Sequence, residues 1–301
     1  MERTQTIDFR QTREVREIVN TTFSFLRLNF LKLGKSIIYI AGPLLLIAAI
    51  RFAGTDNLAL QLDGAALSAD LFGELFLMAL LAGLAMLAAT VVINEYVALY
   101  VQRGNNSFEV GDVLRATISH LWKYILATLA IFFSMVMLYA AVIVMAASVH
   151  PVLLAGLLLI GYLMIAFVLT FIVIPVEGLG ALAAIVRSKE LVAGNWWQTL
   201  SLWMLTYFIE LALTMVVYIP FFTVILIIEI NTPGAAGQSG QSENSSMHLA
   251  AATISFVVIF AAFLLHSIQT IALSLHYFNL VERKEGRGLL REIEQIGTGE
   301  A

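Results

Sequence analysis

Long apolar runs, separated by shorter polar connections, dominate the pattern of the chain. A helix needs about 20 residues to cross a hydrocarbon core of about 30 Å, and six runs reach or approach that length. They are residues 36–53, 71–97, 122–148, 151–175, 198–230 and 247–280. The fourth run contains no charged residue, whereas the first is the shortest and includes Gly42 and Pro43. The pattern predicts an all-α membrane protein with six transmembrane helices.

Three further segments, at 8–30, 108–120 and 178–193, have helical periodicity but are too polar to cross a membrane. In the first, the residues on one helical face are Val15, Ile18, Val19, Thr22, Phe23 and Leu26. Such a helix lies in the headgroup region with its apolar face toward the acyl chains. We therefore predict three cytoplasmic interfacial amphipathic helices.

Aromatic residues mark the points where these segments meet the next span. Trp and Tyr favour the headgroup level of a bilayer because their rings are apolar and their tips are polar. The predicted interfacial anchors are Phe30, Trp122, Tyr124, Trp196 and Trp197. The order of interfacial helix, outward span and return span occurs three times, as in a three-fold hairpin repeat. Unrelated helical hairpins inserted by the same rules give this order too, so a true repeat and a coincidental similarity both stay open.

Composition indicates that lipid is the solvent of the chain. Hydrophobic residues make up 60% of the sequence and charged residues 13%, whereas soluble domains carry about 25% charged residues. No long polar block interrupts the apolar runs, so we expect a single polytopic membrane domain over residues 1–301. The sequence has no cysteine, which excludes disulfides and thiolate metal sites. The net charge of −4 gives no reason to expect nucleic-acid binding.

Positive charges near the span ends predict the orientation, because Lys and Arg are retained on the cytoplasmic side. All but one of the 17 Lys and Arg residues lie in the N-terminal segment, the second and fourth connections or the tail. The exception, Arg51, is at the outer end of the first span, beside a predicted outer loop at 54–70. We expect a bacterial inner-membrane protein whose amphipathic segment 1–33 and tail 283–301 are both cytoplasmic. A polar stretch at 231–246 forms another outer connection.

Glu210 and His266 stand out within the predicted spans. They lie about 18 Å and about 21 Å above the inner ends of the fifth and sixth spans at the helical rise, so their depths nearly coincide. The residues that share their helical faces are Tyr207 and Thr214 on the fifth span and Gln269 and Thr270 on the sixth. We interpret Glu210 and His266 as a candidate intramembrane polar pair. It is either a hydrogen-bonded clasp between helices or a proton-responsive or substrate-binding site.

Catalytic signatures are missing from the sequence. It contains no phosphate-binding glycine loop, no His-Glu-x-x-His helix and no Gly-x-Ser-x-Gly elbow. The five histidines are scattered, and no two have metal-ligand spacing on one helix. We expect no enzymatic activity, no cofactor and no bound metal.

Three stretches resemble a family of uncharacterised six-span inner-membrane proteins of the Bacteroidota type. They are 23–43 (FSFLRLNFLKLGKSIIYIAGP), 187–200 (RSKELVAGNWWQTL) and 277–297 (YFNLVERKEGRGLLREIEQIG). The stretch around Ser188 and Gly194 is also similar to the membrane domain of some bacterial glycerophosphodiester phosphodiesterases. Their catalytic barrel, with its acidic metal site, has no counterpart in this sequence. The resemblance therefore implies a membrane domain and transfers no catalytic residue.

The function we expect is that of a non-catalytic integral membrane protein acting as a scaffold, an assembly partner or a lipid-interacting module. Its expected partners are membrane lipid and other membrane-protein subunits. The alternative is a small-solute or lipid transporter with its site at the level of Glu210 and His266. A water-filled cavity reaching that level would favour transport, whereas an exposed apolar groove would favour assembly.

Overall fold

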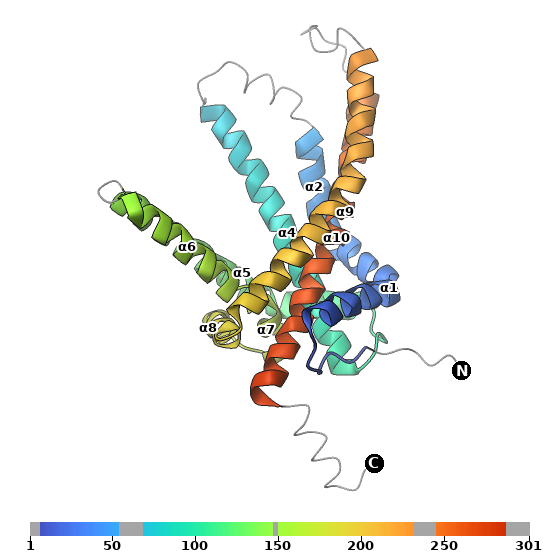
Figure 1. The fold of residues 1–301 in the computed structure, drawn as a ribbon. Helices are drawn as coiled ribbons and strands as arrows, with labels where there is room; N and C mark the ends of the chain where they lie inside the picture. Colours follow the sequence, from blue (N-terminus) through green and yellow to red (C-terminus); the bar gives the residue numbers. More distant parts are fainter. Residues whose placement is uncertain (1–6, 54–68, 147–149, 232–244, 287–301) are drawn as a thin grey trace. The chain divides into compact units, whose positions relative to one another are not determined.

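A computed structural model describes residues 7–53, 69–146, 150–231 and 245–286, and every regular element in these ranges is an α-helix (Figure 1). The helices are α1 (Val15–Ile40), α2 (Gly42–Ala53), α4 (Ala69–Arg103), α5 (Val110–Ala146), α6 (His150–Ala166), α7 (Thr170–Glu177), α8 (Ala181–Val192), α9 (Trp196–Asn231) and α10 (Ser245–Glu285). The predicted all-α class is confirmed. The predicted loops 54–70 and 231–246, and the tail 283–301, fall largely outside the described residues.

Among the described residues, five segments are long and apolar enough to cross a membrane. They are Phe72–Arg103, Val110–Met145, Leu153–Glu177, Trp196–Phe221 and Phe256–Glu285. The helix pair α1 and α2 meets the same criteria together, with a bend of 61°, and gives a sixth span if it is one. The chain is therefore a multi-pass membrane protein.

The bend between α1 and α2 differs from the predicted boundary. We expected an interfacial helix at 8–30 and a separate span from residue 36, but α1 runs unbroken from Val15 to Ile40. The break comes at Ala41, just before Pro43. Proline has no N–H to bond the carbonyl of Tyr39 and its ring clashes with that carbonyl, so the first helix ends there. Proline is well accepted in the first turn of the next helix.

The predicted interfacial helix at 108–120 is not a separate element. It is continuous with the third span in α5, which runs from Val110 to Ala146. After Gly111 this stretch contains no Gly or Pro, the residues that most strongly interrupt helices. The segment at 178–193, by contrast, contains a separate helix, α8, bounded by Gly178 and Gly194 at positive φ.

The fourth span contains a turn that the hydropathy pattern did not indicate. Helix α6 ends at Ala166 and α7 begins at Thr170. Ser188 of α8 satisfies the turn: its Oγ donates to the carbonyl of Ala166 at 2.8 Å and accepts from the N–H of Leu169 at 3.2 Å. A side chain outside the span therefore completes the backbone hydrogen bonding inside it.

The chain divides into two compact units. The first unit comprises Met1–Leu33, Val91–Tyr207 and Ile268–Ala301, and the second Gly34–Thr90 and Phe208–Ser267. The unit boundaries fall inside α1, α4, α9 and α10. This division does not test the single membrane domain, which stays a prediction.

The first unit has an aromatic core that joins distant parts of the sequence. The ring centroid of Phe9 lies 5.3 Å from that of Phe25 and 5.6 Å from that of Phe278, and Phe25 lies 4.9 Å from Tyr100. All four side chains are buried, and edge-to-face aromatic pairs contribute beyond the area they bury. These contacts fix the N-terminal segment against α1, α4 and α10.

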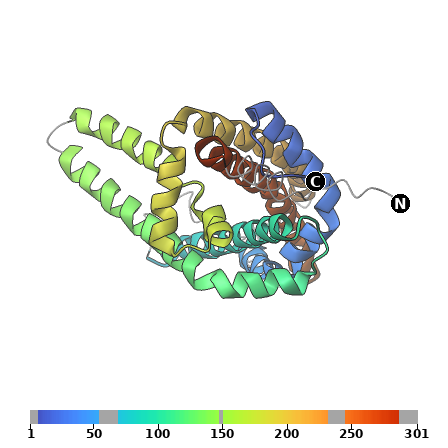
Figure 2. The same cartoon turned by 90° about the horizontal axis from the view of Figure 1, so that it is seen from below.

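The first unit also contains a helical hairpin of α5 and α6. The two helices run side by side, and α8 lies across them near one end (Figure 2). Gly156 of α6 is buried against Val142 of α5, where a Cβ would clash with the valine methyl groups. The helices approach closely because residue 156 has no side chain.

Candidate functional site

Glu210 and His266 are in contact in the second unit. Nδ1 of His266, on α10, lies 3.3 Å from Oε1 of Glu210, on α9. Nε2 of the same ring lies 3.3 Å from Oγ1 of Thr90, on α4. Sequence reasoning placed the first two residues at one depth but missed Thr90. A polar residue on an adjacent span is the signal that would have found it.

The hydrogen-bond roles in this group follow from Thr90. Its hydroxyl donates to the carbonyl of Met86 at 2.9 Å, so in the contact with His266 the hydroxyl oxygen acts as acceptor and Nε2 carries the hydrogen. Nδ1 and Glu210 then share one proton, on either the imidazole or the carboxyl group. The second carboxyl oxygen of Glu210, Oε2, is buried without a hydrogen-bond partner among the described residues.

The remaining residues of the predicted group are distributed over both units. Thr214 is half-buried in the second unit, one helical turn beyond Glu210. In the first unit, Tyr207 is exposed and stacks on Trp203 at a centroid distance of 5.5 Å. Gln269 and Thr270 are buried there, and the carbonyl of Thr270 accepts from Ser274 Oγ at 2.8 Å.

A second buried carboxylate belongs to the first unit. Glu95 of α4 is 1% exposed, and its Oε1 lies 2.8 Å from Nδ1 of His120 and accepts from the hydroxyl of Tyr124 at 3.0 Å. The sequence analysis did not identify this cluster. The spacing of four between His120 and Tyr124, which puts both on one face of α5, was the available signal.

The predicted interfacial anchors fall into two groups. Phe30, Trp122 and Trp197 are 54%, 68% and 75% exposed, as side chains at a lipid interface would be. Trp196 is half-buried, and its indole N–H donates to the carbonyl of Tyr162 at 3.1 Å.

Tyr124 is corrected by the structure. It is fully buried, because its hydroxyl bonds Glu95 and its ring stacks on Phe171 at a centroid distance of 6.1 Å. It is a core residue and not an interfacial anchor.

Arg187 links α8 to α7 and α10. Its Nε lies 3.1 Å from both carboxylate oxygens of Glu177, its Nη2 donates to Glu285, and Tyr277 donates to Glu177 at 2.8 Å. Burial opposes the charge of Arg187, but the hydrogen bonds and charges of Glu285 and Glu177 outweigh it and raise the pKa of Arg187. This network is an ionic clasp between three helices.

Arg13 is a second tied arginine. Its guanidinium donates to the carbonyls of Phe9 and Asp8, and its backbone N–H donates to Oδ1 of Asn279 at 2.9 Å. Burial lowers the pKa of Arg13, and the negative charges of Asp8 and Glu17 partly oppose this. The residue fixes the N-terminal segment on α10.

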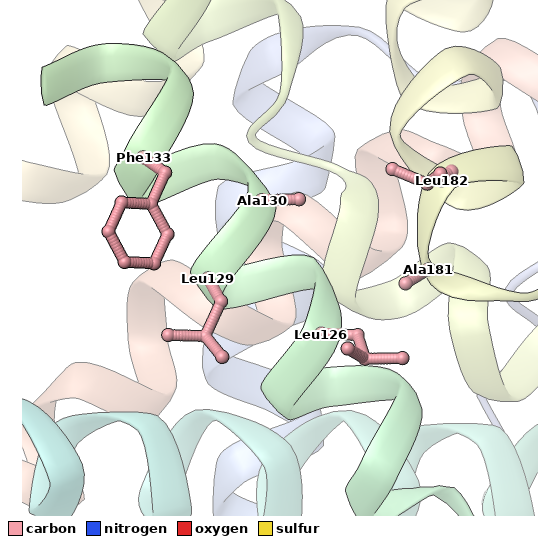
Figure 3. A pocket seen from close by; sticks show the side chains of 6 residues that line it. All are labelled: Leu126, Leu129, Ala130, Phe133, Ala181 and Leu182. Carbon is pink, nitrogen blue, oxygen red and sulfur yellow. The ribbon is translucent and has the colours of Figure 1, made fainter. Parts of the chain in front are cut away.

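An apolar groove lies between α5 and α8 (Figure 3). Its volume is about 270 Å³, and its lining residues are Leu126, Leu129, Ala130, Phe133, Ala181 and Leu182. At the end of the groove near Leu126, Nζ of Lys123 donates to the carbonyl of Gly178 at 2.8 Å. A more polar cavity of about 250 Å³ adjoins the N-terminal segment at Phe9 and Tyr100. Neither cavity is lined by Glu210 or His266.

No group of three His, Cys, Asp or Glu residues suited to a metal ion occurs in the part of the chain that the structure describes. No protein-family model, curated protein or solved structure matches the chain.

Proposed function

We propose that the chain is a non-catalytic membrane protein that acts through its apolar surface, as an assembly partner or a lipid-interacting module. The supporting observation is the exposure of the hairpin of α5 and α6. Of an apolar stretch of 18 residues in the α5 span, only 6% is buried inside the protein. Met137, Val144 and Leu158 are 69%, 72% and 67% exposed. Such a surface is stable against acyl chains or against another apolar protein surface.

The proposal includes the inner membrane as location and cytoplasmic termini. Its support is the distribution of Lys and Arg, which favour the cytoplasmic side of a span. Trp122 and Trp197 are exposed where the third and fifth spans were expected to enter the bilayer, which agrees with an interfacial level for both.

Spin labelling tests the proposal, and the absence of cysteine makes single-cysteine variants straightforward. Met137→Cys and Leu158→Cys carry the label on the hairpin, and Ser107→Cys, exposed between α4 and α5, is the water-facing control. In reconstituted bilayers, hairpin labels that contact lipid should be accessible to oxygen. Hairpin labels covered by a protein partner should be shielded from all relaxing agents. The proposal would be refuted if a water-soluble nickel chelate reached the hairpin labels as readily as it reaches the Ser107→Cys label.

A transporter is the second candidate, and the unpartnered Oε2 of Glu210 favours it. A buried carboxyl oxygen in a span is a potential site for a proton or a polar solute. Proteoliposomes with an imposed pH gradient and an internal pH-sensitive dye test this. Proton entry that is lost in Glu210→Gln supports transport, and equal rates in wild type, Glu210→Gln and empty liposomes exclude proton transport.

A further inference from the structure

We propose that the groove between α5 and α8 binds one acyl chain of an anionic phospholipid, with the lipid phosphate at Lys123. This inference rests on the proposed function and specifies the lipid and its site. The occupant follows from the combination of an apolar groove with a cationic end.

The groove follows one face of α5 away from Lys123. Leu126, Ala130 and Phe133 come three, seven and ten residues after Lys123, spacings that keep them on one side of a helix. Phe133 is about 15 Å from Lys123 along the helix axis at the helical rise. An extended acyl chain can therefore lie along the groove while its head group stays at Lys123.

Lys123 retains hydrogen-bonding capacity for a phosphate. Its ammonium group carries three donors, and the described contact, to the carbonyl of Gly178, uses one. The two nearby carboxyl groups have other partners: Glu177, next in sequence to Gly178, is paired with Arg187, and Glu95, which interacts electrostatically with Lys123, is held by His120 and Tyr124. The neighbouring Trp122 is 68% exposed, as expected for a residue at headgroup level.

The start of α8 adds to the positive character of the same end. Its N-cap is Gly180, and no side chain caps the helix, so its first N–H groups have no intrahelical partner. A Cβ at Gly178 or Gly180 would meet no atom within 4 Å, so the space beside the loop is open. These groups supplement Lys123, which carries the full charge.

Head-group charge must decide which lipid is held. Lipid tails are as apolar as the groove, so an acyl chain gains little by leaving the bilayer for it. A lysine near the membrane surface raises the affinity for an anionic lipid about fivefold. We therefore expect the site to select lipids by head-group charge and not by acyl chain.

Native mass spectrometry of the full chain tests the site. The protein is purified in mild detergent with equimolar phosphatidylglycerol and phosphatidylcholine of identical acyl chains. We expect wild type to retain one phosphatidylglycerol about fivefold more often than phosphatidylcholine. Lys123→Gln should lose this preference, and Lys189→Gln, which removes an exposed charge from α8, should keep it.

A second pair of variants probes the groove without changing charge. Ala130→Leu fills the groove and should reduce retention of both lipids, whereas Ala140→Leu, at an exposed position of α5, should not. Equal retention of the two lipids by wild type overturns the inference. An equal loss of the phosphatidylglycerol preference in Lys123→Gln and Lys189→Gln also overturns it. In either case the spin-label accessibility at Met137 and Leu158 would still decide the proposed function independently.

Discussion

In the part of the chain that the structure describes, two carboxyl groups, the buried Glu95 and the half-buried Glu210, contact histidines. Glu95 contacts His120 and Tyr124, and Glu210 contacts His266. A full charge in the centre of a bilayer costs at least about 2.5–3.5 kcal/mol. A histidine partner lowers this cost because the pair can exist as a neutral acid and a neutral imidazole. Such pairs join helices without requiring a buried lysine or arginine.

Removing the hydroxyl group of Tyr124 tests the Glu95 cluster. Tyr124→Phe keeps the ring on Phe171 but deletes the hydrogen bond to Glu95, so we expect a loss of about 1 kcal/mol in unfolding free energy. Tyr139→Phe, at a 53% exposed position of the same helix, should have no effect. Denaturant unfolding in detergent micelles measures both, and equal stability of the two variants would contradict a role for the contact.

The Glu210 and His266 contact is expected to contribute modestly to stability. Hydrogen bonds between membrane helices average about 0.6 kcal/mol, so Glu210→Ala should cost about that amount. His266→Ala also removes the contact to Thr90 and should cost about twice as much. Thr214→Val, one turn away on α9, is the control. A loss well above these values in denaturant titration would show that the pair is more than a clasp.

At the scale of elements, close approach of helices depends on single small residues. Gly156 meets Val142 at the hairpin of α5 and α6, whereas Gly161, further along α6, has no atom within 4 Å of a potential Cβ. Valine is stiff at χ1 in a helix and cannot easily turn its methyl groups away. The two glycines therefore differ in what a methyl group would do.

Gly156→Ala should weaken the hairpin. Forcing an extra methyl group into a packed contact typically costs about 1–3 kcal/mol, so we expect a lower midpoint of thermal unfolding than for wild type. Gly161→Ala should be neutral or slightly stabilising, because alanine favours the helix over glycine. Thermal scans in one detergent compare the two variants directly, and a neutral Gly156→Ala would mean that the helices can separate there freely.

The five segments long and apolar enough to cross a membrane among the described residues each overlap a run predicted from hydropathy, but hydropathy did not predict the breaks. Run length and lack of charge identify a membrane helix because the bilayer fixes both. The bend at Ala41 and the turn after Ala166 depend on local backbone bonding, through Pro43 in one case and Ser188 in the other. Tyr124 was misplaced for a related reason: a tyrosine near a span end suits the interface, and only its distant partner Glu95 makes it a core residue.

At the scale of the whole molecule, orientation is the main property that the sequence predicts and that labelling can test. Ser107 lies between α4 and α5, in a connection expected in the cytoplasm, and residue 239 belongs to a predicted outer connection. A membrane-impermeant maleimide should label Ser239→Cys in intact cells and Ser107→Cys only after permeabilisation. The opposite pattern would invert the orientation, and labelling of both in intact cells would contradict the odd number of spans predicted between positions 107 and 239.

The turn in the fourth span has a consequence for biogenesis. Its two backbone groups, the carbonyl of Ala166 and the N–H of Leu169, are satisfied by a side chain that is synthesised later, at residue 188. Unsatisfied backbone groups are costly in lipid. The span therefore cannot reach its final hydrogen-bonded form until residue 188 of α8 has been synthesised.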